Sequence, residues 1–253
     1  MQVMTLKFKN QVLELYKSAF PGDSEEFAEK FINRYFEKNC RYNLVDSKVS
    51  SMLFLFDCTL HTEKKAYPAS YLYAAATLPG MRGKGEMSRL IERVKREERL
   101  IVTRPADDSL FSFYQKFGFK TVFYCDEYVY SRVLTDAPKL EEISYEEYYE
   151  KREELLKGIG HLTLEETKEF AVSDMLLLGG EGICCAVDTS EDIPVVYEFL
   201  SEKDYGEEAV LNYLDKDTAV FRGKEPKKPF AMVWSCDENI ELPDKMYMGL
   251  AME

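Results

Sequence analysis

The chain has 253 residues, of which 45% are hydrophobic and 13% aromatic, and its formal net charge at pH 7 is −13. This composition supports a folded core and excludes an intrinsically disordered protein. No apolar run reaches the roughly 18 residues of a membrane span, and no signal-peptide pattern is present, so we expect neither a membrane anchor nor secretion. The six cysteines include no Cys-x-x-Cys pair, and His61 and His161 are the only histidines. We therefore expect a cytoplasmic protein with reduced thiols and no metal site.

Charge is distributed unevenly along the sequence. Residues 1–130 carry 20 Lys and Arg against 17 Asp and Glu, whereas residues 131–253 carry 13 against 29. The acidic second half disfavours nucleic-acid binding and would attract a cationic or amine substrate by long-range steering. The alternative interpretation is that this acidity serves solubility alone.

The first half begins with two predicted helices and a predicted hairpin. A helix over residues 9–20 ends at Pro21-Gly22, and Asp23-Ser24-Glu25-Glu26 has the capping-box pattern that starts a second helix. Residue type and alternation predict strands over residues 42–45, 51–60 and 67–78, with a polar turn at 61–65.

Residues 71–88 form the most informative stretch, because an apolar strand leads through a basic, glycine-containing loop into a helix. An apolar stripe with helical spacing begins at Met87, so the helix starts close to the loop Arg-Gly-Lys-Gly at 82–85. The free N–H groups of the first helical turn, the positive end of the helix dipole and the two basic side chains would bind a diphosphate. The predicted diphosphate site consists of Arg82, Gly83, Lys84, Gly85, Glu86, Met87 and Ser88.

Two alternatives exist for this loop. It could be a solvated turn with incidental charges, or a nucleotide-binding P-loop. The P-loop pattern G-x-x-x-x-G-K-[ST] is absent. The dinucleotide pattern G-x-G-x-x-G fails as well, because Ser88 stands where its last glycine would be.

A second informative segment covers residues 100–119. A short buried strand is predicted over 100–103, a turn with capping residues over 105–108, and a short helix over 110–116 that Gly118 closes. A further strand is predicted over 121–130.

Together these two segments resemble the GCN5-related N-acetyltransferase (GNAT) superfamily over roughly residues 1–130. The acetyl-CoA motif of that superfamily, (Gln/Arg)-x-x-Gly-x-(Gly/Ala), is matched at Arg82 and Gly85 and departs at Met87. The subfamily that resembles the enhanced-intracellular-survival acetyltransferases tolerates a large apolar residue there. The ending F-Y-x-K-x-G-F is matched by Phe113, Tyr114, Lys116, Gly118 and Phe119.

The resemblance implies a fold and a binding mode. The fold is of the α/β (α+β) class, with a mixed central sheet flanked by helices, and its first strand, expected near residues 3–6, is missing or unrecognised. Acetyl-CoA would be the co-substrate, with no metal. Backbone N–H groups of Ala75, Ala76 and Thr77 would bind the pantetheine and face the thioester oxygen. Small side chains there also suit tight packing against a helix.

The resemblance also assigns catalytic roles. Tyr114 would be the general acid that protonates the CoA thiolate, although a buried tyrosine of an aromatic helix is often only a core residue. Ser109 would donate a hydrogen bond to the pantetheine or pyrophosphate, with helix N-capping as the alternative.

The group that removes the proton of the amine stays open. The candidates are Glu26, Asp57, His61 and the terminal carboxylate of Glu253, which survival-type relatives direct into the site of the first domain. Direct attack by the neutral minority of the amine is a further possibility.

The second half is predicted to be a degenerate copy of the first. A linker near residues 134–144 separates domain 1–134, which would bind acetyl-CoA, from an acidic GNAT-like domain 135–253. In the place of the basic loop stand Glu202-Lys203-Asp204-Tyr205-Gly206-Glu207, whose carboxylates would repel a diphosphate. Helices are predicted over 145–157 and 207–214, a helical or mixed segment over 163–178, and strands over 183–187, 195–200, 219–222, 230–235 and 246–252.

We therefore expect an acetyl-CoA-dependent N-acetyltransferase, an acyltransferase that acts on the primary amine of a small cationic, aminoglycoside-like acceptor. A non-catalytic acyl-CoA-binding or scaffolding protein on the same fold is the alternative, and acylation of a protein lysine or N-terminus is a third. The partner expected is a small-molecule amine, without nucleic acid or membrane. A homo-oligomer is possible, and the sequence does not decide the oligomeric state.

Overall fold

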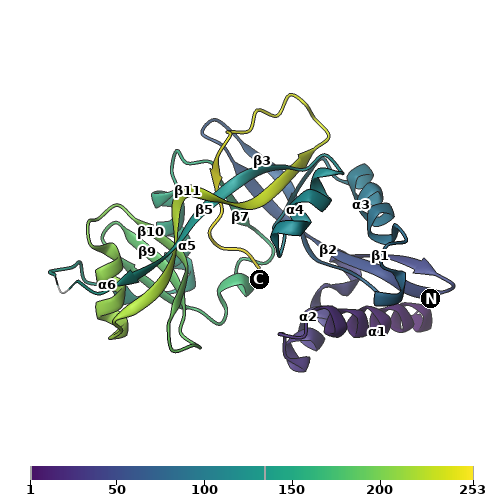
Figure 1. The fold of residues 1–253 in the computed structure, drawn as a ribbon, viewed down its shortest axis with the longest axis horizontal. Helices are drawn as coiled ribbons and strands as arrows, with labels where there is room; N and C mark the ends of the chain where they lie inside the picture. Colours follow the sequence, from purple (N-terminus) through teal and green to yellow (C-terminus); the bar gives the residue numbers. More distant parts are fainter. Residues whose placement is uncertain (1, 134, 253) are drawn as a thin grey trace.

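The computed structural model describes residues 2–133 and 135–252 as an α/β protein with one mixed sheet flanked by helices, which confirms the predicted fold class (Figure 1). The elements of the first half are α1 (Gln2–Ala19), α2 (Glu25–Asn39), β1 (Cys40–Val45), β2 (Lys48–His61), β3 (Ala66–Thr77), α3 (Glu86–Glu97), β4 (Leu100–Thr103), α4 (Asp108–Gln115) and β5 (Lys120–Ser131). Those of the second half are β6 (Glu141–Glu142), α5 (Tyr145–Leu155), β7 (His161–Leu164), β8 (Leu176–Gly180), β9 (Ile183–Asp188), β10 (Val195–Ser201), α6 (Gly206–Leu214), β11 (Thr218–Ser235) and β12 (Met246–Tyr247).

The strands of both halves belong to one sheet. Their order in the described residues is β4-β3-β2-β7-β12-β5-β11-β10-β9-β8-β6, with β1 paired to β2. Strand β11 also pairs with β4, so β4, β3, β2, β7, β12, β5 and β11 form a closed ring of strand pairings. Figure 1 shows β5 and β11 running together from one lobe into the other. Leu134 lies outside the described residues, and the domain boundary placed there stays a prediction.

Helix α2 shows how the sequence fixes the first lobe. The Ser24 hydroxyl caps the helix by accepting a hydrogen bond from the Phe27 amide at 3.1 Å, while Asp23 stays outside the helix. The buried ring of Phe31 then packs edge-on against Phe54 of β2, with 4.9 Å between their centroids. Apolar burial and the cap therefore place α2 against the sheet.

Some predicted elements are wrong in extent or type. Residues 3–6 are helical within α1, so the first strand of the superfamily is missing there, not unrecognised. The two strands expected over 219–222 and 230–235 form a single strand, β11, because pairing with β5 resumes after a register shift between Gly223 and Lys228. Only Met246–Tyr247 is a strand in the last segment. The segment predicted as helical or mixed contains parts of β7 and β8 and a 3₁₀ turn, Phe170–Val172.

The second half repeats part of the topology of the first. In the first half, β2 and β3 are antiparallel and β4 follows α3 parallel to β3. In the second half, β9 and β10 are antiparallel and β11 follows α6 parallel to β10. The residue that precedes each crossover helix is left-handed, Gly85 with φ of 79° and Tyr205 with φ of 59°. This correspondence supports the interpretation of the second half as a degenerate copy.

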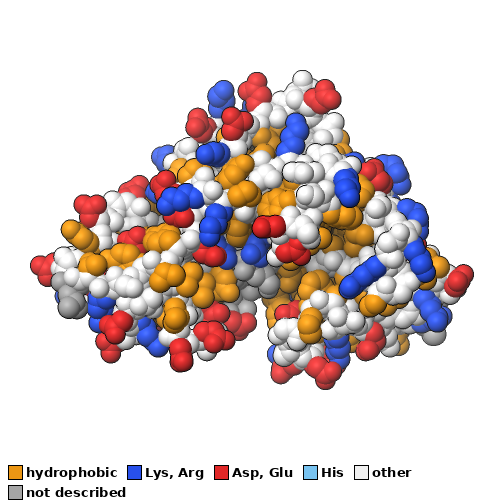
Figure 2. Space-filling model, viewed as in Figure 1, with side chains coloured by type: hydrophobic (Ala, Val, Ile, Leu, Met, Phe, Trp, Pro, Cys, Tyr) orange, Lys and Arg blue, Asp and Glu red, His pale blue; other side chains and the backbone are white. Residues whose placement is uncertain are grey.

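The surface carries both signs of charge and is notched between the lobes. In Figure 2 the lower notch separates the lobe of α1 and α2 from the lobe of the second half, and acidic side chains occur on both of its sides. In residues 2–133 and 135–252, no helix is long and apolar enough to cross a membrane.

Candidate functional site

Strands β3 and β4 separate at their carboxyl ends. Strand β3 pairs with β4 only from Ser70 to Leu72, but it pairs with β2 as far as Thr77. The β2–β3 register shifts near the separation, and Ala74 there has a positive φ of 50°. Beyond Leu72, the β4-facing edge of β3 has no strand partner among the described residues. This part of β3 includes the Ala75–Thr77 backbone expected to bind pantetheine.

A cavity of about 220 Å³ lies at the separation. Its lining includes Tyr73, Ala74, Ala75, Thr103, Tyr114 and Met252. The structure therefore brings the splayed strand, the expected general acid and the C-terminal segment together. Thr77 lies further along β3, where its carbonyl accepts a hydrogen bond from Arg82 Nε at 3.3 Å.

The basic loop precedes α3 with two glycines in the left-handed conformation. Gly83 and Gly85 have φ of +74° and +79°, a region that disfavours side chains. Gly85 is the N-cap residue and has no side chain with which to cap the helix. Arg82 and Lys84 are exposed beside it. The first turn of α3 therefore combines a positive dipole end with two cations.

Glu86 has a role that the sequence did not reveal. Its carboxylate is buried, accepts a hydrogen bond from Ser50 Oγ at 3.0 Å and pairs with the Arg89 guanidinium. Its carbonyl accepts a hydrogen bond from Asn43 Nδ2 at 2.8 Å. The side chain thus fastens α3 to the β1–β2 hairpin. Met87 and Ser88 follow it, half-buried in the first turn of the helix.

Tyr114 combines burial with access to the cavity. Its side chain is 5% exposed and its ring packs against Phe113 and Phe119. Burial raises the pKa of the phenol to about 12, although a hydrogen bond with the Thr103 side chain acts in the opposite direction. A phenol with this pKa keeps its proton at neutral pH, as a general acid must.

Ser109 lies on the exposed start of α4. Its hydroxyl donates to Asp107 Oδ1 at 2.5 Å, and Asp107 also accepts hydrogen bonds from the amides of Ser109 and Leu110. Asp107, not Ser109, is therefore the N-cap residue, and the capping alternative for Ser109 is wrong. The contact of Ser109 with the cofactor stays a prediction.

The structure does not place the candidate bases in the cavity. Glu26 is exposed on α2 and pairs with Lys30 at 2.7 Å. Asp57 is exposed on β2, with Lys38 at 3.5 Å. His61 stacks on another ring in a different part of the sheet. None of these three side chains lines the cavity between β3 and β4, and Glu253 lies outside the described residues.

Asp23 is the functional candidate that the sequence interpretation missed, because its place in a capping box suggested a local role. It is the one carboxylate among the described residues that line the cavity. Tyr16 Oη donates a hydrogen bond to Asp23 Oδ2 at 2.7 Å, and Tyr16 also shares a hydrogen bond with Tyr73. Burial raises the pKa of Tyr73 to about 12, so both phenols are neutral partners of the carboxylate.

A second hollow of about 200 Å³ adjoins the cavity, because Tyr73 and Met252 line both. Its lining combines aromatic rings from both halves of the chain with two carboxylates from the second half: Phe27, Phe170, Tyr197, Asp174 and Asp188. Aromatic faces and carboxylates together suit an organic cation.

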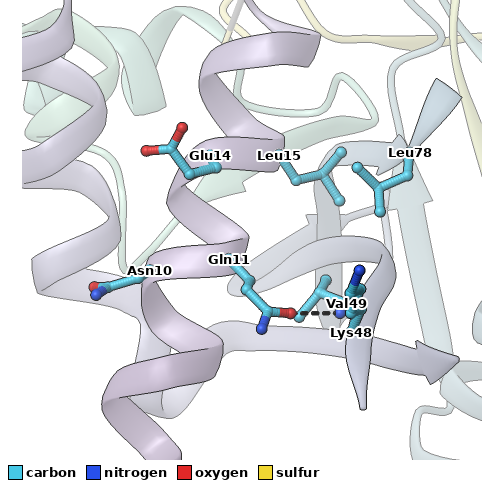
Figure 3. A pocket seen from close by; sticks show the side chains of 7 residues that line it. All are labelled: Asn10, Gln11, Glu14, Leu15, Lys48, Val49 and Leu78. Carbon is cyan, nitrogen blue, oxygen red and sulfur yellow. Dashed lines mark hydrogen bonds between the residues drawn. The ribbon is translucent and has the colours of Figure 1, made fainter. Parts of the chain in front are cut away.

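A third hollow of about 380 Å³ lies between α1 and the start of β2 (Figure 3). It is lined by Asn10, Gln11, Glu14, Leu15, Lys48, Val49 and Leu78. Gln11 Oε1 accepts a hydrogen bond from the Val49 amide at 2.7 Å and so links the two elements. This hollow shares no lining residue with the cavity between β3 and β4.

Comparison with known proteins agrees with this geometry. Residues 2–122 match the family model of the acetyltransferase (GNAT) domain. No curated protein matches the sequence. A GCN5-related N-acetyltransferase from Kribbella flavida superposes with a TM-score of 0.70 at 13% identity, over 90% of this chain and 70% of that one.

Two further solved structures have a similar fold. Eis1 from Mycobacterium abscessus has a TM-score of 0.63 at 11% identity, over 91% of this chain and 71% of its own. A tandem GNAT protein of the clavulanic acid biosynthesis pathway has a TM-score of 0.50 at 11% identity, over 92% of this chain and 96% of that one. At these identities the likeness shows the fold alone. Residues 2–122 are similar to the acetyltransferase (GNAT) domain family.

Proposed function

We propose that the protein transfers an acetyl group from acetyl-CoA to the primary amine of a small cationic acceptor. The observation that carries this proposal is the cavity where the splayed edge of β3 meets the Tyr114 phenol. A thioester placed there would have backbone N–H donors on one side and a proton donor on the other.

The residues present fit acetyl-CoA. The left-handed Gly85 opens α3 without a capping side chain, and Arg82 and Lys84 supply positive charge for the diphosphate. Ala75 lines the cavity, and with Ala76 it presents little side-chain bulk, so the backbone of β3 can approach a pantetheine arm. The loop of the second half, with Glu202 and Asp204, lacks these properties. We therefore propose one acetyl-CoA site per chain, in the first half.

The proposed reaction forms one bond and breaks another. The amine nitrogen attacks the thioester carbon, and the N–H groups at Ala75 and its neighbours in β3 stabilise the oxyanion. The carbon–sulfur bond then breaks, and Tyr114 gives its proton to the departing thiolate. Asp23 receives the proton that the amine loses, directly or through one water molecule. Tyr16 orients this carboxylate by its 2.7 Å hydrogen bond.

The acceptor would occupy the adjoining hollow. Asp174 and Asp188 attract a cation there, and the rings of Phe27, Phe170 and Tyr197 supply aromatic surface against which it can pack. The excess of acidic residues in the second half would add long-range attraction. These features support a cationic amine as the substrate class.

The experiment is an acceptor screen that measures CoA thiol release with polyamines, aminoglycosides and lysine peptides, after calorimetry has established CoA binding. We expect one CoA per chain and turnover with at least one small polyamine or aminoglycoside. Binding of CoA without turnover of any amine would support the non-catalytic alternative. Exclusive turnover of lysine peptides would refute the small-acceptor proposal.

A further inference from the structure

Both histidines of the chain meet one carboxylate where the two halves join. His61 on β2 and His161 on β7 stand directly opposite each other in an antiparallel pairing. Their rings are parallel within 6°, with centroids 4.5 Å apart. Glu153 reaches them from α5, and one ligand atom from each of the three residues lies within 4.8 Å of the others. The sequence interpretation did not expect this cluster, because the two histidines are far apart in the chain.

Hydrogen bonding around His161 leaves one ring nitrogen facing an anion. Nδ1 lies 2.7 Å from the carbonyl oxygen of Ile159, which only accepts hydrogen bonds, so Nδ1 carries a proton. Nε2 lies 3.3 Å from Glu153 Oε2. In the neutral ring, a lone pair would therefore face a carboxylate, which is unfavourable unless a cation lies between them. Either a second proton or a metal ion resolves this conflict.

The neighbouring groups leave the required ligand atoms available. Glu153 Oε1 is occupied by Thr163 Oγ1 at 2.8 Å and by Arg152 Nη1 at 3.3 Å, whereas Oε2 faces His161. The charge of Arg152 is balanced by Glu198 at 2.8 Å.

We propose that His61, His161 and Glu153 bind a divalent transition-metal ion of the zinc type. Two imidazole nitrogens and one carboxylate oxygen form a ligand set that Zn²⁺ uses in proteins, with water in the fourth position. The Nδ1–H bond to Ile159 would orient His161 for coordination through Nε2, as carbonyl partners of ligating histidines do. Because His61 is half-buried and Glu153 partly exposed, their side chains can turn to bring the ligand atoms together.

The metal would join the two halves of the chain. His61 belongs to the first half, whereas His161 and Glu153 belong to a strand and a helix of the second half. None of the three lines the cavity between β3 and β4. The site would therefore stabilise the assembled fold without taking part in acetyl transfer, and this inference does not depend on the proposed function.

The experiment titrates untagged, chelator-treated Cys236→Ser protein with Zn²⁺ in a calorimeter, because the exposed Cys236 thiol could bind zinc on its own. We expect one Zn²⁺ per chain, an increase in Tm, and a visible absorption band with Co²⁺ that Zn²⁺ displaces. His61→Gln and Glu153→Gln should each weaken zinc binding by more than about tenfold. The matched control is Asp57→Asn, an exposed carboxylate on the same strand as His61, which should bind as the parent does.

Three results would overturn the proposal. No zinc binding by the folded protein would mean that His161 pairs with Glu153 through a proton instead. Zinc binding of equal strength in His61→Gln and Glu153→Gln would place the ion elsewhere. If Asp57→Asn lost as much zinc affinity as His61→Gln and Glu153→Gln, the binding would be unspecific binding to the surface. Since His61 and Glu153 are partly exposed, their variants should remain folded, which circular dichroism checks.

Discussion

At the scale of single residues, the diphosphate site depends on a position without a side chain. Gly85→Glu should abolish CoA binding, because a side chain and a negative charge would enter the start of α3 at a left-handed φ of +79°. The loop is accessible, so the protein should stay folded. Calorimetry with CoA measures the effect. Gly22→Glu, at an exposed glycine with nothing within 4 Å of an added Cβ, is the matched control and should bind CoA normally.

Tyr114 provides the test of catalysis. Tyr114→Phe should keep CoA affinity and lower kcat by about 10²-fold or more, because the departing thiolate would lose its positioned acid. Steady-state kinetics with the best acceptor measure the effect, and Tyr124→Phe on β5 serves as a control that leaves the cavity lining intact. If Tyr114→Phe turned over every acceptor at the parent rate, the phenol would be a core residue only.

The residue scale also shows where the sequence was informative. The left-handed glycines and the buried Tyr114 belong to local motifs, and local motifs can be recognised from spacing. Asp23 and Glu86 could not be assigned from spacing. Their roles come from partners distant in the chain, Tyr73 and Met252 around the cavity for Asp23 and Ser50 for Glu86. Tertiary contacts of this kind leave no periodic signal.

At the scale of elements, the C-terminal segment is held by close packing. An added Cβ at Gly249 would overlap Tyr247 Oη and lie 2.6 Å from Tyr247 Cζ and 3.3 Å from Glu198 Oε1. Gly249→Ala should therefore destabilise the protein by about 1–3 kcal/mol and reduce activity, because Met252 would leave the cavity. Denaturant unfolding and kinetics measure the two effects. Adding Tyr247→Phe to Gly249→Ala should restore part of the stability, because the Tyr247 Oη atom that the new Cβ would overlap is removed.

Elements were predicted well where local periodicity and turns decide them, as for β2, β3 and α3. The predictions failed where pairing with a distant strand overrides composition. The stretch from Gly223 to Pro229 is rich in lysine and proline and looks like a loop, yet it lies within β11 because β5 pairs with it on either side of a bulge. The strand expected at 246–252 shortens to Met246–Tyr247, which is held between β5 and β7.

At the scale of the whole molecule, the ring of strand pairings requires both halves. A chain ending at residue 134 would lack β7, β11 and β12, which leaves β5 without a strand partner and β4 paired on one edge alone. We expect this fragment to be insoluble or unfolded, since unpaired edges and exposed apolar faces promote association. Size-exclusion chromatography and circular dichroism measure the outcome. Co-expression with residues 135–253 should restore folded material, and a monomeric, folded fragment would contradict the expectation.

The uneven charge leads to a prediction about kinetics. With one CoA per chain in the first half, kcat/KM for the best cationic amine should fall as salt rises, because screening limits electrostatic attraction to about 8–10 Å near physiological ionic strength. A neutral amine of similar size should show little salt dependence. Two CoA molecules per chain would refute the degenerate-copy interpretation. Salt-independent kinetics with the cationic amine would leave the acidity as a solubility feature.

The pairing of β4 with β11 has a consequence for synthesis on the ribosome. Residues 100–103 emerge early, but residues 232–235, which complete their strand pairing, emerge near the end of the chain. Because translation adds roughly 5–20 residues per second, one edge of β4 stays unpaired for several seconds. The nascent first half therefore passes through a stage that can associate wrongly with other chains, and we expect its yield to depend on chaperones that bind the chain during translation.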